Sequence, residues 1–135
     1  SKNNWPLLIH LNEPVGHYYP GKTKYSIKTG EQLAENFPQT NFIFAHLGGG
    51  LLFYELMPEM KERLKNVYYD TAAVPFLYNE KIYETIQAAG ASDKVIFGSD
   101  YPLLGYPKFK EQFDKSNLAS ENFNKIMGGN IEKLL

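Results

Sequence analysis

Two histidines and an aspartate in this sequence each follow a short apolar run, and their side chains could bind a metal ion or transfer a proton. His10 follows LLI, His46 follows FIFA, and Asp100 follows VIFGS. Unbroken apolar runs of this length are typical of strands buried in a parallel sheet, and ligands of parallel α/β folds bind beyond the carboxyl ends of the strands. Imidazole and carboxylate groups bind zinc and move protons near neutral pH. The three positions are therefore candidates for metal-assisted or acid–base chemistry.

The elements that must position these side chains alternate between strand and helix. Each predicted strand is followed by a segment of helical periodicity, and the strands are expected at residues 5–11, 42–45, 66–71 and 94–97. Such alternation indicates parallel strands joined by right-handed crossovers. A (β/α)8 barrel uses about 31 residues for each βα unit, which is close to the separation of His10 and His46. We therefore expect an α/β fold of about four βα units, half of a (β/α)8 TIM barrel, in a single domain over residues 1–135.

Prolines and glycines predict where the helices break. Pro58 interrupts the apolar periodicity of the segment after the second strand, which predicts a kink or two short helical pieces. Near the end of the chain, Gly128 and Gly129 predict the end of a helix. Asn130 is then expected to cap a separate final turn.

The composition excludes several classes of protein. The 135 residues carry a net charge of −1, so the chain lacks the basic surface that nucleic acids and anionic membranes require. The absence of cysteine excludes disulfides and leaves His and carboxylate groups as metal ligands. No apolar run reaches the roughly 20 residues of a membrane span, and a cytoplasmic location is expected. Because the chain begins at Ser1, shortly before its first predicted strand, we expect it to be a piece of a longer protein.

Four segments of the chain resemble a known family. IHLNEP, NFIFAHLGGG, VIFGSDYP and NFNKIMGGNIEKLL are similar to the C-terminal half of the amidohydrolase-related, metal-dependent TIM-barrel enzymes. That family includes hydrolases and decarboxylases of the aminocarboxymuconate-semialdehyde type. The resemblance covers nearly the whole chain, and AHLGGG followed by FGSDYP at this spacing is fairly specific. It implies the fold of a C-terminal half-barrel.

The resemblance also implies a role for each candidate residue. His10, at the end of strand five of the family barrel, would be a metal ligand. His46 would be a general acid/base or an electrophile beside the metal, and Asp100 would bind the metal and take a proton from its water. The implied cofactor is a divalent metal, expected to be Zn²⁺, which lowers the pKa of bound water to about 7. The implied substrate is a small carboxylate, lactone or amide.

The sequence departs from the family in one respect. The His-x-His pair that strand one contributes is absent, and His10 with Asp100 makes two ligands where a catalytic zinc has about three. The chain therefore contains half of an active site. Two hypotheses follow: part of a metal-dependent hydrolase or decarboxylase, or a catalytically silent half-barrel that acts as a structural unit.

A further set of residues is expected to contact the substrate: Glu13, His17, Gly48, Gly49 and Tyr101. Each has an alternative interpretation. Glu13 could instead cap its own loop, and His17 could simply face water. The glycines could cradle a phosphate or make room beside His46. Asp70, at the end of the third strand, could point into the mouth of the barrel or hold a turn.

Half of a barrel also predicts a partner. Four parallel strands leave two open edges and one uncovered face, which invite pairing with another chain. We expect either a homo-oligomer, in which two copies close one barrel, or association with an N-terminal half.

Overall fold

Four parallel strands form the centre of the molecule in a computed structural model that describes residues 5–135. They pair in chain order and comprise β1 (Leu7–Ile9), β2 (Phe42–Phe44), β3 (Val67–Asp70) and β4 (Val95–Ile96). In this register Leu8 lies beside Ile43, and Ile43 lies beside Tyr68. The four predicted strands are confirmed, each shorter than its predicted range.

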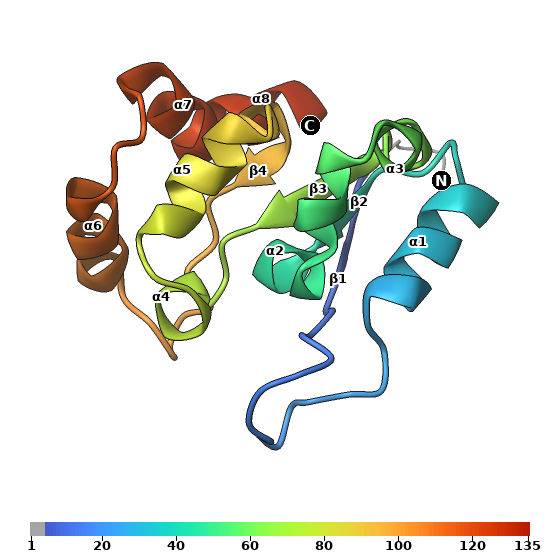
Figure 1. Cartoon of the computed structure of the whole chain (residues 1–135), viewed down its shortest axis with the longest axis horizontal. Coiled ribbons are helices and arrows are strands. Elements are labelled where there is room, and N and C mark those ends of the chain that lie inside the picture. Colours follow the sequence, from blue (N-terminus) through green and yellow to red (C-terminus); the bar gives the residue numbers. More distant parts are fainter. Residues whose placement is uncertain (1–4) are drawn as a thin grey trace.

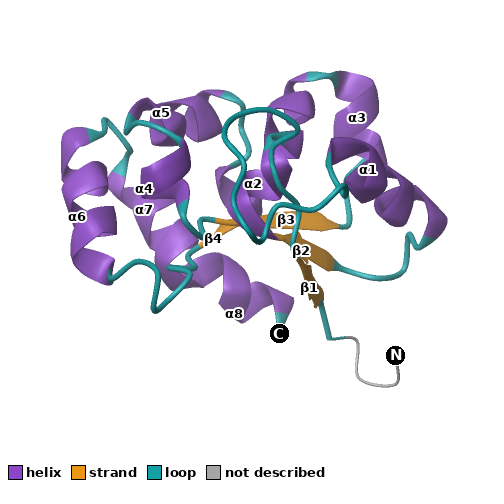
Figure 2. Cartoon of the chain, turned by 90° about the horizontal axis from the view of Figure 1, so that it is seen from below, coloured by secondary structure: helices purple, strands orange, loops and turns teal. Residues whose placement is uncertain are grey.

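Helices connect the strands and cover the sheet (Figure 1). The helical elements are α1 (Ile27–Asn36), α2 (Ala45–Gly49), α3 (Pro58–Arg63), α4 (Val74–Leu77), α5 (Lys81–Ala88), α6 (Tyr106–Lys115), α7 (Ser120–Asn124) and α8 (Asn130–Leu134), with short 3₁₀ segments at Leu51–Leu56 and Ser92–Lys94. Figure 2 shows α1, α3 and α5 above the strands and α8 below them. Within residues 5–135, no helix is long and apolar enough to cross a membrane.

The core lies between the sheet and its helices. Phe42 and Phe44 of β2 stack with ring centroids 5.6 Å apart, and both are buried. Val67 and Tyr69 of β3 are completely buried as well. The edge strand β1 differs, because Leu8 is 66% exposed. The sheet therefore has a covered part and an uncovered edge, as a half-barrel would.

An ion pair between a buried carboxylate and a partly buried lysine lies beside this core. Lys94 Nζ lies 2.8 Å from Glu55 Oε1, and the Glu55 side chain is 1% exposed. The hydroxyl of Tyr69 donates a hydrogen bond to the same oxygen at 2.9 Å. The carboxylate is thus held by a cation and a hydroxyl, which a buried charge requires.

The predicted helix breaks are partly confirmed. Pro58 begins α3 after a separate 3₁₀ segment, so the two-piece prediction is confirmed. The predicted stop at Gly128 and Gly129 is wrong, since α7 continues through a π-helical turn (Lys125–Gly129) into α8. Asn130 has helical φ of −79°, and its amide donates to the carbonyls of Ser92 and Val95 at 2.7 Å each. It anchors the helix to β4 and does not cap a separate turn.

Candidate active site

The chain leaves β2 in a left-handed turn that places His46. His46 and Leu47 have φ values of 58° and 53°, and Gly48, Gly49 and Gly50 continue with 67°, 61° and 95°. A left-handed conformation is unfavourable for residues with a Cβ atom, which explains why three glycines follow. Leu47 is completely buried and fastens the turn to the core. The turn therefore sets the direction of the His46 side chain.

Asp70, the last residue of β3, and Ala72, two residues later, hold His46 in place. Asp70 Oδ1 accepts a hydrogen bond from the backbone N–H of His46 at 3.0 Å and from that of Ala72 at 2.9 Å. The carbonyl of Ala72 lies 2.8 Å from His46 Nδ1. Burial raises the pKa of the Asp70 carboxyl above its usual value, and the two N–H donors act in the opposite direction. Of the two roles considered for Asp70, the structure shows that it holds a turn.

His10 and His46 form a hydrogen-bonded pair. His46 Nε2 lies 3.1 Å from His10 Nδ1, and the rings meet edge to face with centroids 4.9 Å apart. His46 is buried at 8% exposure, whereas His10 is exposed. Since one ring of the pair is buried and the other is exposed, the pair could pass a proton between His46 and a ligand in contact with His10.

Asp100 lies on the same side of the sheet as the histidine pair. It follows β4 in a left-handed conformation with φ of 65°. Asp100, His10 and His46 line one cavity of about 510 Å³. Among residues 5–135, no group of three or more His, Cys, Asp or Glu side chains could hold a metal ion. His10 and Asp100 have the donor chemistry of zinc ligands, but by themselves they make an incomplete set.

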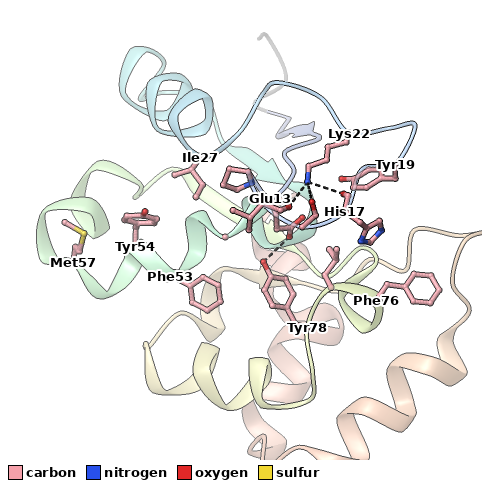
Figure 3. Close-up of a pocket in the computed structure, with 16 residues that line it drawn as sticks. Glu13, His17, Tyr19, Lys22, Ile27, Phe53, Tyr54, Met57, Phe76 and Tyr78 are labelled. Carbon is pink, nitrogen blue, oxygen red and sulfur yellow. Dashed lines mark hydrogen bonds between the residues drawn. The ribbon is translucent and has the colours of Figure 1, made fainter.

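A second, larger cavity of about 700 Å³ (Figure 3) shares lining residues with the first. Aromatic and apolar side chains line much of it, including Ile27, Phe53, Tyr54, Met57, Phe76 and Leu77. Polar side chains line it too, among them Glu13, whose Oε1 accepts a hydrogen bond from the Tyr78 hydroxyl at 3.0 Å. Burial, and then the Glu13 carboxylate, raises the pKa of Tyr78 above its usual 10, so Tyr78 stays a donor.

The long loop after β1 forms one wall of this cavity. Buried Asn12 holds the loop, because its Oδ1 accepts hydrogen bonds from the backbone and hydroxyl of Thr23 at 2.8 and 3.0 Å. Lys22 crosses the loop and donates to the carbonyls of Gly16 and His17 at 3.4 and 3.3 Å (Figure 3). The loop is thus pinned at its base and its tip, which keeps Glu13 at the cavity.

The structure places the five predicted substrate contacts in different surroundings. Glu13, His17 and Gly49 line the larger cavity, and His17 also lines the smaller one. Gly48 instead packs toward Tyr69, where a Cβ atom would lie 3.1 Å from the ring. Tyr101 is 82% exposed and is not among the residues that line either cavity.

Three residues of the site were not anticipated from the sequence. Tyr78 meets Glu13 across 65 positions of the chain, and Ala72 acts through its backbone carbonyl. Phe53, in the 3₁₀ segment after the turn, lines the larger cavity and is 37% exposed. No local pattern identifies these contacts, although the NEP sequence at Asn12 marks the loop that carries Glu13.

Comparison with known proteins places this geometry in a family and a fold. The family model described as amidohydrolase matches residues 2–135. No curated protein matches the chain. Among solved structures, 5-carboxyvanillate decarboxylase from Sphingomonas paucimobilis has a TM-score of 0.71 at 14% identity, covering 98% of this chain and 50% of the other.

Two further structures agree in fold. A TIM-barrel protein from Bordetella bronchiseptica has a TM-score of 0.70 at 21% identity, with 98% of this chain and 46% of that protein covered. A dihydroxybenzoic acid decarboxylase from a Polaromonas species, with bound manganese and an inhibitor, has a TM-score of 0.68 at 16% identity, with 97% and 49% covered. The chain thus spans about half the length of these proteins, and its four strands are half of a TIM barrel.

Proposed function

The chain belongs to the amidohydrolase family, and we propose that it forms the C-terminal half of a metal-dependent active site for a small carboxylate, lactone or amide. The observation that carries this proposal is the convergence of His10, His46 and Asp100 on one cavity. These residue types at the carboxyl ends of parallel strands are suited to metal binding and proton transfer.

His10 and Asp100 are the proposed ligands of a divalent metal, with the remaining ligands supplied from outside residues 5–135. Such a metal, when bound, polarises a substrate carbonyl and acidifies water. Imidazole and carboxylate donors are among the ligands that Zn²⁺ accepts in catalytic sites. Manganese, which the Polaromonas enzyme binds, is the competing identity.

His46 is the proposed acid/base residue. Its Nδ1 faces a carbonyl, so Nε2 is the atom that can take up or release a proton. That atom already meets His10, which places it beside the proposed metal ligand. Asp100 lines the same cavity and is the second candidate for accepting a proton.

The two adjoining cavities support a substrate with two chemically different ends. They share lining residues, which are His17, Tyr19, Phe76 and Leu77. The reacting group would occupy the cavity beside His46, and an apolar or aromatic group would occupy the larger cavity. Glu13 would accept a hydrogen bond from a hydroxyl or amine of that group. Both hydrolysis and decarboxylation are compatible with such a substrate.

Completion of the barrel is the second part of the proposal. Strand β1 is at the edge of the described sheet, and Leu7 and Leu8 are 51% and 66% exposed on it. An N-terminal half-barrel would cover this edge and supply the missing metal ligands, and a second copy of the chain would be the alternative partner. We expect the isolated chain to be inactive.

The incomplete ligand set also supports a second candidate function. With two candidate ligands among the described residues, the chain could be a silent half-barrel that associates with other chains without catalysis. The two functions differ in one measurable property, which is whether the completed protein binds metal in proportion to its active sites.

The test is metal analysis and turnover of the completed barrel, with the variant Asp100→Asn. Asparagine tolerates the left-handed conformation at this position, so the fold should be preserved. We expect metal content to fall and turnover to drop by about 100-fold or more, as for loss of an important catalytic group. Asp114→Asn, on the exposed surface of α6, is the control and should change neither. A fully metallated, active Asp100→Asn enzyme would refute the assignment.

A further inference from the structure

The position of the His46 ring depends on a conformation that needs support. A left-handed backbone is unfavourable for a residue with a Cβ atom, and His46 and Leu47 both adopt it. Ala73, on the facing segment after β3, is also left-handed, with φ of 55°. Two unfavourable segments therefore face each other here, and the surrounding contacts must fix both.

Asp70 joins these two segments. A single oxygen, Oδ1, accepts the N–H of His46 at 3.0 Å and the N–H of Ala72 at 2.9 Å, and the residue is 7% exposed. Hydrogen bonds to a buried acceptor of this kind are strong. The carboxylate thus holds the backbone that carries the His46 ring and also the backbone that carries the carbonyl facing it.

That carbonyl determines the tautomer of His46. A carbonyl oxygen can only accept, so the Ala72 oxygen at 2.8 Å requires a proton on His46 Nδ1. In the neutral ring, Nε2 is then an acceptor, and His10 Nδ1 at 3.1 Å must be the donor. His10 Nε2 consequently keeps its lone pair. The chain of contacts that starts at Asp70 therefore decides which nitrogen is available on each ring.

We propose that Asp70 is a positioning residue that holds His46 as its Nδ1–H tautomer through the Ala72 carbonyl and thereby orients the His10–His46 pair. Asp70 acts through the two backbone segments and touches no reacting atom. The functional meaning of this arrangement rests on the proposed role of His46. The hydrogen-bond arrangement itself does not, so it is tested without metal or substrate.

The test is nuclear magnetic resonance of the imidazole nitrogens in the full chain labelled with ¹⁵N-histidine. The chain has three histidines, and a His17→Gln variant removes the one that lies outside the pair. The spectra are recorded near pH 8, where most histidine rings are neutral. Wild-type His46 should be mainly Nδ1–H, and Asp70→Ala should lower its ratio of Nδ1–H to Nε2–H by about tenfold, the effect expected for losing a hydrogen bond to a charged group.

Two variants separate positioning from a loss of stability. Asp70→Asn keeps an Oδ1 acceptor and should retain the wild-type ratio. Asn66→Ala is the matched control, because Asn66 is buried directly before β3 and its amide donates to the carbonyls of Ala34 in α1 and of Phe37 and Thr40 after it. It should destabilise the chain without changing the His46 tautomer.

Several results would overturn the proposal. These are a wild-type His46 that is mainly Nε2–H, a ratio unchanged in folded Asp70→Ala, a ratio altered in Asp70→Asn, or an equal change in Asn66→Ala. If Asp70→Ala does not fold, Asp70→Ser takes its place, since serine is too short to reach both N–H groups. If the His46 tautomer depends on Asp70 but the completed barrel binds no metal, the proposed function is refuted and this inference stands.

Discussion

Replacing Gly49 by alanine tests the packing of the left-handed turn against the loop after β1. A Cβ atom at Gly49 would lie 2.4 Å from the carbonyl oxygen and 2.5 Å from the carbonyl carbon of Asn12. Both are backbone atoms, and Asn12 is 1% exposed, so neither side can move without displacing packed structure. The substitution therefore combines an unfavourable φ with an overlap that cannot be relieved by rotating a side chain.

The neighbouring glycine provides the reference value. At Gly50 a Cβ atom would meet its nearest atoms at 3.8 and 3.9 Å, which is ordinary contact, while φ is 95°. Gly50→Ala should thus lower the free energy of unfolding only by the cost of a left-handed backbone at alanine, about 1–2 kcal/mol. Gly49→Ala adds the overlap, for which insertion into a packed region costs about 1–3 kcal/mol or more. We expect a total of about 4 kcal/mol for Gly49→Ala, a large part of the stability of a small domain.

Urea unfolding of the full chain, followed by circular dichroism, measures both values. If Gly49→Ala and Gly50→Ala lower the free energy of unfolding equally, the close approach between the turn and Asn12 does not exist. Wild-type stability in either variant would also contradict the left-handed conformation of the turn.

Three other predictions concern the core, the pH dependence and the open edge. Lys94→Met should lower the free energy of unfolding, measured in urea, by about 3–5 kcal/mol, because it leaves the buried Glu55 carboxylate without its cation. The double variant with Glu55→Gln should recover part of that loss. A loss below about 1 kcal/mol in Lys94→Met would contradict the prediction. Burial raises the pKa of Asp70, so the folded chain keeps this proton to a higher pH than the unfolded chain, and the contribution of Asp70 to stability should fall as the pH rises from about 4. As the pH rises from about 4, the free energy of unfolding should fall less in Asp70→Asn than in the wild-type chain. An identical pH profile for the two chains would refute the prediction. Leu8→Lys should reduce association of the isolated chain in light scattering, whereas Tyr18→Lys, at a more exposed position in the loop after β1, should not. Equal effects of the two substitutions would exclude the β1 edge as the interface.

The strand ends and helix segments could be predicted from the sequence because their signals are local. Short runs of apolar or β-forming residues identified all four strands, and Pro58 identified a break between two helical pieces, since both depend on residues close in the chain. The same reasoning failed at Gly128 and Gly129. There the helix continues because Asn130 donates to carbonyls of a segment more than 30 residues earlier, a stabilisation that outweighs the weak helix propensity of glycine.

The sequence by itself determined which residues could do chemistry and at which end of the sheet they would lie. A parallel sheet brings the carboxyl ends of its strands to one edge, so His10, His46 and Asp100 had to share it. The tertiary structure alone decided their contacts: the pairing of the two rings, the tautomer imposed by Ala72, and the meeting of Glu13 with Tyr78. The physical reason is that strand and helix signals come from near neighbours. A hydrogen bond between distant residues depends instead on where packing leaves two loops.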